Sequence, residues 1–386
     1  MMVTNSSDEK YKMKKKYDYL IVGAGLFGTT FAREMTDAGY KCLVVDRRNH
    51  IGGNVYSEKK NGIDVHVYGA HIFHTNSDAI WEYVNRFATF NKYINKPKVR
   101  FKDKIYSFPI NLMTLHQLWG VTSPAEAEKK LQEVRIPCEN PDNLEDWILS
   151  QVGREIYETF IRGYTMKQWQ RDPRELPASI IKRLPIRLIF EENYFFDKYQ
   201  GIPHEGYTAM VNNMLDGIEV RTGVEYFDQR DELEALAERV VFTGKVDEYF
   251  DYCEGELEYR TLRFEHEELE GDYQGNAVVN YTHPDVPFTR ILEHKHFLPD
   301  TAGKIKNTII TREYSAEYKR GKTPYYPIND AKNSAMYAKY VELKKTRPDV
   351  IFGGRLAEYK YYDMHQVIGS ALAKARRELE KRQQIS

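Results

Sequence analysis

The chain has 386 residues, 41% of them hydrophobic, which is enough for two or three packed units with a sizeable core. Its 56 basic and 57 acidic residues give a formal net charge of −1, which offers no long-range attraction to nucleic acid or to an anionic membrane. No run of 18 apolar residues and no Cys/His ligand spacing occurs, so we expect no stable membrane insertion, no disulfide framework and no metal site.

Residues 1–16 are polar and lysine-rich and lack the apolar stretch of a signal peptide. They predict a disordered N-terminal extension. Together with the three scattered cysteines, Cys42, Cys138 and Cys253, they favour a cytoplasmic protein.

Residues 17–54 have the order strand, glycine turn, helix, strand and acid that is typical of a dinucleotide-binding unit. Gly23 permits a tight turn, Gly25 lets the main chain approach a pyrophosphate, and Gly28 lets the helix pack closely on its strand. The diphosphate would lie at the helix N-terminus. Asp46 ends the second strand. It lies close to the position, roughly 20 residues after the third glycine, at which such units carry the acid that accepts a ribose hydroxyl.

A second basic and glycine-rich turn follows at Arg47 and Gly52-Gly53-Asn54. It comes too soon to open another unit, and its paired glycines would let the backbone reach the same long cofactor again. This turn resembles the signature of flavoproteins such as amine oxidases and desaturases, which favours FAD over NAD.

Residues 62–76 predict an alternating strand that breaks at Gly69 and is followed by two histidines. The alternation places the apolar residues on one face and Asp64 and His66 on the other. Gly69 would allow the chain to bring His71 close to a planar group, although a lone histidine is more often a satisfied core or surface residue.

Residues 78–90 predict an amphipathic helix and residues 93–108 a β-hairpin. The helical period of residues 111–183 then indicates an inserted helical domain, in which Gly163 interrupts the pattern beside Tyr164. Aromatic residues at helical spacing are usually core, but this glycine favours a cleft in which the Tyr164 ring stacks on a planar base.

The tract at 179–207 is too basic and too aromatic for a plain connector, since it holds Arg183, Arg187 and three tyrosines. Arginine binds phosphate oxygens through two parallel hydrogen bonds and tyrosine adds neutral donors, so the tract favours a diphosphate site.

The strand, helix and strand pattern returns at 218–243, which indicates that the nucleotide domain is discontinuous. Residues 259–311 predict antiparallel strands, one of which carries Arg290. Near the C-terminus, Tyr325-Tyr326 lie between prolines, a strand at 350–352 meets a glycine pair, and residues 364–381 predict a helix. Asp363 is either only the cap of that helix or a residue beside the electron-rich part of a flavin.

Seven segments are spread along the chain between residues 68 and 366: YGAHIFHT (68–75), GYTMKQW (163–169), ELPASIIKRLP (175–185), NYFFDKYQGIP (193–203), VPFTRILEHKHF (286–297), TPYYPIND (323–330) and FGGRLAEYKYYDMHQ (352–366). In this order they resemble the bacterial UDP-galactopyranose mutase family. The resemblance implies an α/β fold with α+β insertions. A discontinuous Rossmann-like FAD-binding domain would comprise residues 17–90, 205–250 and 345–386. A helical domain with a mobile loop would comprise residues 109–184, and an antiparallel sheet domain residues 91–108, 185–204 and 251–344.

The resemblance also implies the activity, the interconversion of UDP-galactopyranose and UDP-galactofuranose for cell-surface polysaccharide by a homodimer. As the resemblance implies, N5 of reduced FAD would act as the nucleophile on the anomeric carbon, UDP would be the leaving group, and the sugar ring would open and close again through another hydroxyl. The sequence shows no evident Ser/His/Asp set and no paired carboxylates at a sugar site, so the cofactor must carry the covalent step.

Three sets of site residues follow from the resemblance. The catalytic set would be Arg183 and Arg290, which hold the two phosphates, and His71, which lies against the isoalloxazine ring. The substrate set would add Phe160, Tyr164, Trp169, Tyr194, Arg260, Asn280, Tyr326, Tyr361 and Asp363. The cofactor set would be Gly23, Gly25, Leu26, Phe27, Gly28, Asp46, Arg47, Gly53, Asn54, His71, Arg355, Asp363 and Met364.

Two residues depart from the family pattern. Gln170 stands where members often have glycine, which bears on how the following loop closes, and Ile161 stands where some members have a second aromatic residue. Two other functions are compatible with the nucleotide unit alone: a flavin oxidoreductase of the amine-oxidase or desaturase kind, and a non-catalytic nucleotide-binding protein.

Overall fold

Five parallel strands form the sheet of the nucleotide-binding unit in the computed structural model, which describes residues 15–178, 181 and 185–385. Their order is β16-β10-β1-β2-β9. The bounds are Tyr17–Val22 for β1, Cys42–Asp46 for β2, Glu219–Thr222 for β9, Ala237–Phe242 for β10 and Val350–Phe352 for β16. The sheet therefore joins segments from the start, the middle and the end of the chain, and the predicted α/β fold with a Rossmann-like unit is confirmed.

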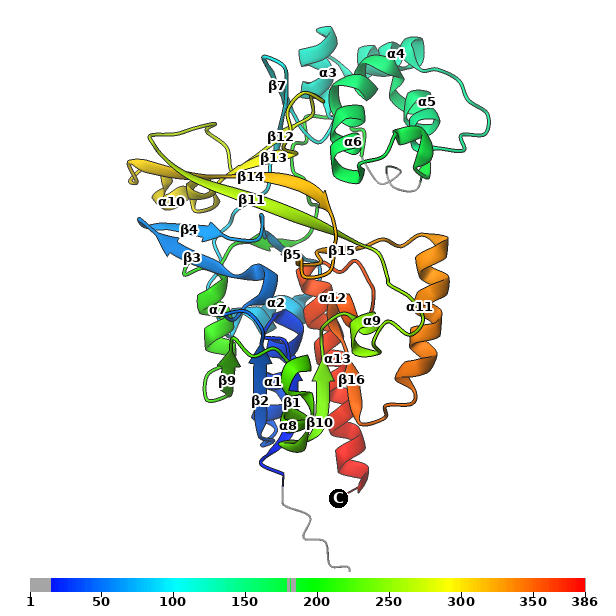
Figure 1. Ribbon diagram of the computed structural model, residues 1–386. Helices are drawn as coiled ribbons and strands as arrows, with labels where there is room; N and C mark the ends of the chain where they lie inside the picture. Colours follow the sequence, from blue (N-terminus) through cyan, green and yellow to red (C-terminus); the bar gives the residue numbers. More distant parts are fainter. Residues whose placement is uncertain (1–14, 179–180, 182–184, 386) are drawn as a thin grey trace, which may run out of the picture.

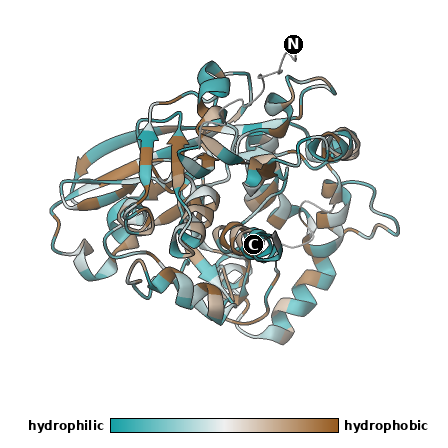
Figure 2. Ribbon diagram, turned by 90° about the horizontal axis from the view of Figure 1, so that it is seen from below, coloured by the Kyte–Doolittle hydropathy of each residue, from teal (hydrophilic) through white to brown (hydrophobic). Residues whose placement is uncertain are grey.

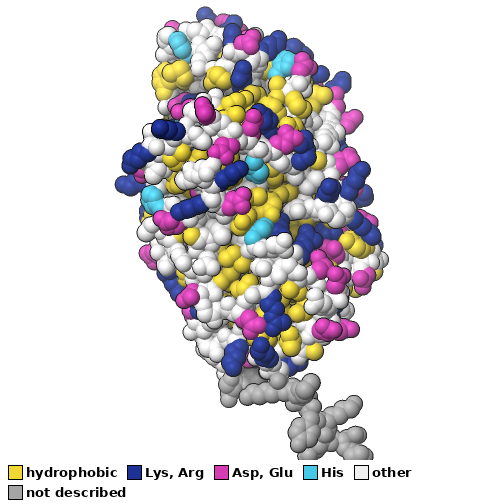
Figure 3. Space-filling view, turned by 60° about the vertical axis from the view of Figure 1, so that its left-hand side comes forward, with side chains coloured by type: hydrophobic (Ala, Val, Ile, Leu, Met, Phe, Trp, Pro, Cys, Tyr) yellow, Lys and Arg dark blue, Asp and Glu magenta, His cyan; other side chains and the backbone are white. Residues whose placement is uncertain are grey.

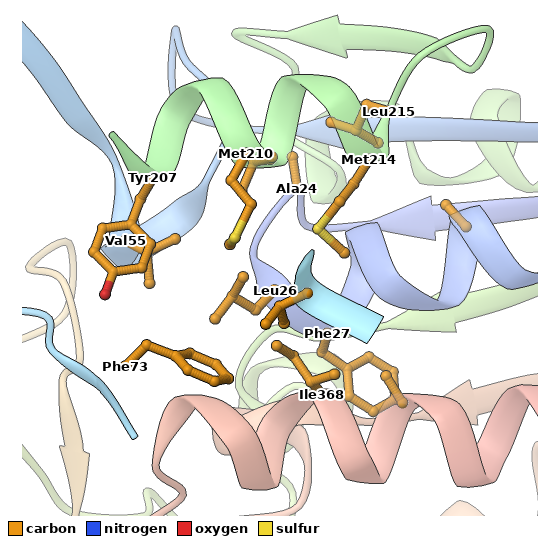
Figure 4. Packing of buried hydrophobic residues seen from close by; sticks show 14 of the residues in the cluster. Ala24, Leu26, Phe27, Val55, Phe73, Tyr207, Met210, Met214, Leu215 and Ile368 are labelled. Atoms are coloured by element: carbon orange, nitrogen blue, oxygen red, sulfur yellow. The ribbon is translucent and has the colours of Figure 1, made fainter. Parts of the chain in front are cut away.

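Two helices that are far apart in sequence pack against each other on this sheet, namely α1 (Leu26–Asp37) and α13 (Met364–Ile385). Phe27 of α1 and Ile368 of α13 are 3% and 0% exposed, and their side chains lie side by side in Figure 4. Burying each such side chain contributes about 1.5–3 kcal/mol. In Figure 2, where α13 is seen nearly end-on at the C-terminal mark, the hydrophobic colour lies on one side of this helix.

A seven-stranded sheet has the order β15-β11-β14-β13-β12-β6-β7 and lies next to the nucleotide unit (Figure 1). Its strands are β6 (Lys98–Phe101), β7 (Lys104–Ser107), β11 (Tyr259–Glu270), β12 (Val278–Tyr281), β13 (Arg290–Glu293), β14 (Asn307–Glu317) and β15 (Tyr326–Pro327). One pair differs from the predicted antiparallel pattern, because β6 runs parallel to β12. The β6–β7 hairpin comes from a distant part of the chain, so no tight turn dictates its direction.

The helical region has its own hydrophobic core and forms the end of the molecule beyond the seven-stranded sheet (Figure 1). It comprises α3 (Leu112–Trp119), α4 (Pro124–Val134), α5 (Leu144–Ile156), a π-helix η2 (Tyr157–Arg162), α6 (Gly163–Trp169) and η3 (Pro173–Glu175). The prediction that Gly163 interrupts the helix is wrong, because it is the first residue of α6. It is required for close packing, since a Cβ there would lie 2.1 Å from the Thr282 carbonyl oxygen.

Two short sheets connect these parts: β3 (Ser57–Lys60) with β4 (Ile63–His66), and β5 (Phe73–Thr75) with β8 (Tyr199–Gly201). The predicted polar face of β4 is not exposed, because Asp64 and His66 are buried as fully as their apolar neighbours. Helix α7 and the η6 turn, both from later in the chain, cover that face. The predicted helix at 78–90 is also shorter, since α2 spans Asp78–Asn85.

The remaining described helices are short, apart from α11. They are η1 (Gly53–Val55), α7 (Tyr207–Met214), η5 (Phe227–Gln229), α8 (Arg230–Ala235), α9 (Val246–Tyr249), η6 (His294–Phe297), α10 (Pro299–Ala302), α11 (Ala331–Lys344) and α12 (Gly354–Ala357). In the part of the chain that is described, no helix is long and apolar enough to cross a membrane. Basic and acidic side chains are interspersed on the face shown in Figure 3, in keeping with the net charge.

Candidate active site

The predicted glycine turn lies at the carboxyl ends of β1 and β2, and Asp46 ties these ends together. The Ala24 backbone N–H donates to Asp46 Oδ2 over 2.8 Å and the Arg48 N–H to Asp46 Oδ1 over 2.9 Å. Gly23 has a φ of 113°, and a Cβ there would lie 2.0 Å from Thr243 Oγ1. The acid thus orders the turn and keeps lone pairs on both oxygens for a ribose hydroxyl.

The second glycine turn packs directly on the first. Gly53 has a φ of 55°, and a Cβ added to it would lie 2.9 Å from the Gly25 Cα atom. The Gly52 N–H also donates to the Ala24 carbonyl oxygen over 2.9 Å. The two turns therefore form one wall of glycine backbone, which allows the close approach of a diphosphate.

A pocket opens along this wall and is lined by residues from all parts of the nucleotide unit. Of the predicted cofactor residues, the following line it: Gly23, Gly25, Leu26, Phe27, Gly28, Asp46, Arg47, Gly53, Asn54, His71, Arg355 and Met364. Asp363 does not line it. Its backbone N–H donates to Gln366 Oε1 over 2.9 Å, which is half of the predicted capping box. Its carboxylate gathers with His74 and His365, with one ligand atom of each within 4.8 Å of the others.

The sequence interpretation missed Arg48, which also lines this pocket. Its Nη2 donates to Asn54 Oδ1 over 2.8 Å and its guanidinium lies 4.4 Å from the centre of the Tyr68 ring. Its Nη1 is buried without a hydrogen-bond partner among the described residues. A buried guanidinium nitrogen without a partner fits an anionic group of a bound cofactor. The basic turn after Asp46 was the signal that could have identified it.

His71 reaches the pocket from the turn after β4. Its Nδ1 lies 2.8 Å from the Gly69 carbonyl oxygen, which can only accept, so Nδ1 carries the proton and Nε2 does not. The pKa of His71 is lowered to about 4, chiefly by burial and to a smaller extent by Arg355 and Arg290, while the hydrogen bond to Gly69 opposes the shift. The imidazole is therefore neutral, with a free lone pair on a residue that lines the cofactor pocket.

Arg290 is close enough to His71 to lower its pKa, and it forms an ion pair with a buried acid. Its Nη2 is 2.9 Å from Glu313 Oε2, and the Glu313 side chain is 2% exposed. Burial opposes the charge on Arg290, but Glu313 and the phenols of Tyr164 and Tyr326 outweigh it and raise the arginine pKa. Glu313 was missed by the sequence interpretation, although alternate polar positions along the buried strand β14 could have indicated a polar inward face.

Tyrosine side chains gather around Arg290. Burial raises the pKa of Tyr164 to about 12, and this phenol interacts with Arg290, Tyr194 and Tyr361. The Tyr326 and Tyr361 rings stack at 5.2 Å. Arg355 lies 5.7 Å and 5.6 Å from their centres and is held by the carbonyl oxygens of Tyr325 and Tyr362. The structure therefore brings these predicted substrate residues together at the end of the cofactor pocket that His71 and Arg355 line.

Other predicted residues lie less directly at this cluster. Asn280 is paired with Arg290 across β12 and β13. Phe160 is 3% exposed in the helical core, against which Trp169 packs. Arg260 donates through Nη2 to the Gln168 carbonyl oxygen and to Ser315 Oγ, so it holds the end of α6. Arg183 lies outside the described residues.

The two residues that depart from the family pattern have clear structural roles. Ile161 is 3% exposed and belongs to the core of the helical region. Gln170 follows the last residue of α6 in a left-handed conformation, with φ 52° and ψ 36°, which is the conformation that glycine favours. Its side-chain Nε2 donates to the Ser315 carbonyl oxygen over 3.2 Å.

Comparisons with known proteins agree with these features. Residues 159–361 match the family model described as UDP-galactopyranose mutase, and residues 21–87 match a NAD(P)-binding Rossmann-like domain. A probable UDP-galactopyranose mutase of Klebsiella pneumoniae is 41% identical, covering 92% of this chain and 93% of the relative. A dTDP-fucopyranose mutase of Escherichia coli is 40% identical, covering 92% and 96%. The crystal structure of a reduced UDP-galactopyranose mutase superposes with a TM-score of 0.69 at 13% identity, covering 94% of both chains.

The family match spans more than half of the chain, and the Klebsiella relative is matched over almost its entire length. The chain therefore belongs to the UDP-galactopyranose mutase family, as its sequence motifs predicted.

Proposed function

We propose that the protein interconverts UDP-galactopyranose and UDP-galactofuranose, with FAD bound in the nucleotide pocket and active in its reduced state. The observation that carries the proposal is the position of Arg290 and its tyrosines at His71, which lines the cofactor pocket. A nucleotide diphosphate held by this cluster would have its sugar beside the cofactor.

The chain's own residues would bind and neutralise the diphosphate. Arg290 carries a permanent positive charge, and Glu313 raises its pKa further, so it can hold a phosphate through two hydrogen bonds. Tyr164 and Tyr326 have raised pKa values and remain neutral donors to phosphate oxygens. Arg183 is proposed as the second phosphate ligand. Reduced FAD, when bound, supplies the nucleophile for the anomeric carbon.

His71 would contribute an uncharged surface to the cofactor. With Nδ1–H donated to Gly69, the ring presents the Nε2 lone pair and no positive charge. A neutral imidazole at this position does not compete with Arg290 for the negative charge of the leaving diphosphate.

The direct experiment is incubation of the purified protein with UDP-galactofuranose and dithionite, followed by chromatography of the nucleotide sugars. We expect conversion to UDP-galactopyranose that depends on the reductant. dTDP-fucopyranose should be assayed in parallel, because the Escherichia coli relative named for that sugar is almost as similar as the Klebsiella protein. Conversion of neither nucleotide sugar would overturn the proposal.

An oxidoreductase of the amine-oxidase or desaturase kind is the alternative. The arginines and phenols around Arg290 suit a diphosphate, whereas substrates of such enzymes are mostly apolar or cationic. Oxygen or dye consumption with an amine, without conversion of either nucleotide sugar, would favour it. The homodimer, the cytoplasmic location, the supply of galactofuranose to cell-surface polysaccharide and the domain boundaries remain predictions.

A further inference from the structure

Two buried histidines lie behind His71 and have no part in the proposed reaction. His66 is on β4 and His294 is the first residue of η6, and each is 1% exposed. The His66 ring stacks on Phe297, with centres 4.8 Å apart and an interplanar angle of 8°. Imidazoles in such positions can form hydrogen bonds only with groups of the protein, because water cannot reach them.

Backbone amides determine which nitrogen of each ring carries the proton. The His71 N–H donates to His66 Nδ1 over 3.2 Å, and the His66 N–H donates to His294 Nδ1, also over 3.2 Å. A ring nitrogen that accepts a hydrogen bond is unprotonated, so a neutral imidazole must carry its proton on the other nitrogen. Both rings are therefore Nε2–H tautomers.

The opposite sides of the two rings differ. His66 Nε2 lies 3.7 Å from Asp64 Oδ2, which is beyond hydrogen-bond distance, and neither atom has a hydrogen-bond partner among the described residues. His294 Nε2 lies 2.6 Å from Thr311 Oγ1, which in turn is 2.7 Å from His266 Nδ1. Burial holds the pKa of His66 well below its usual range and lowers that of His294 to about 3, so both rings are neutral.

We propose that His66 is a positioning residue for His71: its unprotonated Nδ1 fixes the His71 backbone so that Nδ1–H stays on Gly69 and Nε2 stays unprotonated at the cofactor pocket. His294 holds His66 by the same kind of bond. The inference concerns residues of this chain and rests on the proposed function only for its effect on turnover.

The test compares two substitutions at the same position. In His66→Asn the side-chain oxygen can accept from the His71 N–H much as Nδ1 does, whereas His66→Leu fills space without an acceptor. Removing a partner that orients a metal-bound histidine lowers metal affinity or activity by about 10–100-fold. We therefore expect at least about a tenfold loss of kcat in His66→Leu. We expect KM for UDP-galactofuranose to stay within about twofold, and His66→Asn to retain most of the turnover. His204→Leu, at an exposed histidine, is the matched control.

A second measurement does not depend on activity. Long-range proton–nitrogen NMR correlations of histidine-labelled wild-type protein at pH 7 should show His66 as the Nε2–H tautomer and His71 as the Nδ1–H tautomer. In His66→Leu the His71 signal should shift toward a mixture of tautomers, with His66→Asn close to wild type. A His66 that is protonated on Nδ1 or charged in the wild type would overturn the proposal. So would equal losses in the Asn and Leu variants. Because the spectrum is independent of turnover, absence of mutase activity would count against the proposed function and leave this test intact.

Discussion

Replacing Arg290 by alanine should damage stability and turnover through separate causes, and a second substitution can distinguish them. Arg290→Ala leaves the Glu313 carboxylate, whose side chain is 2% exposed, without its partner. Removing one member of a buried ion pair costs about 3–5 kcal/mol. The Arg290 side chain is 25% exposed, so we expect the lower end, about 3 kcal/mol. Over 386 residues this corresponds to a fall in Tm of about 4 °C.

Turnover should fall by more than stability explains. If Arg290 holds the departing diphosphate, losing a charged bidentate contact worth about 3–5 kcal/mol in the transition state slows kcat by about 10²–10⁴-fold. In Arg290→Ala/Glu313→Gln no unpaired carboxylate remains, so most of the Tm should return while turnover stays low. Thermal unfolding and the chromatographic assay measure the two effects, with flavin absorbance as the check on cofactor content. A double variant that regains near wild-type turnover would refute the assignment of Arg290 to the substrate.

Three further perturbations test other parts of the structure. Burial depresses the folded-state pKa values of His66 and His294 below the usual 6.5. As the pH falls through 6.5, the unfolded chain therefore binds more protons than the folded protein. Each histidine should lower the free energy of unfolding by about 2 kcal/mol at pH 5. Denaturation midpoints that do not change between pH 7.5 and 5 would contradict this. Gly53→Ala, with a φ of 55° and a Cβ 2.9 Å from the facing turn, should be purified with little flavin while still folding, as absorbance and circular dichroism would show. Gln170→Gly removes a side-chain hydrogen bond and relieves the strain of a left-handed backbone conformation. The free energy of unfolding of this variant should therefore stay within about 1 kcal/mol of wild type in denaturant titrations. A larger loss would show that the side-chain hydrogen bond dominates.

Local sequence patterns predicted the parts of the fold that depend on local physics. The turn at Gly23, the strand end at Asp46 and the hairpin at 98–107 each follow from residues that are close together in the chain. What surrounds a segment was not predictable in the same way. Asp64 and His66 alternate with apolar residues as on an exposed strand, but α7 and η6, more than a hundred residues later, bury them.

The candidate site shows the same division. Family motifs indicated Arg290 and Tyr164. The pairing of Arg290 with Glu313, however, depends on the register of β13 against β14, which no single segment reveals. Gly163 was expected to interrupt a helix and to present Tyr164 in a cleft. The structure instead requires glycine there because the residue contacts the Thr282 backbone, and only the packing of the helical region beside β12 determines that contact.

The parallel sheet has a consequence for how the protein is made. Strand β1 lies between β2 and β10. Strand β16, which pairs with β10 at the edge of the sheet, and helix α13 are among the last parts of the chain to be synthesised. The nucleotide pocket, lined by both residue 23 and residue 364, thus stays incomplete on the ribosome until synthesis is nearly finished. The helical region, contiguous from residue 112 to 175, can collapse long before that. Loss of the C-terminal helix should therefore yield chains with a folded middle and no bound flavin, the opposite of what a self-contained N-terminal nucleotide domain would give.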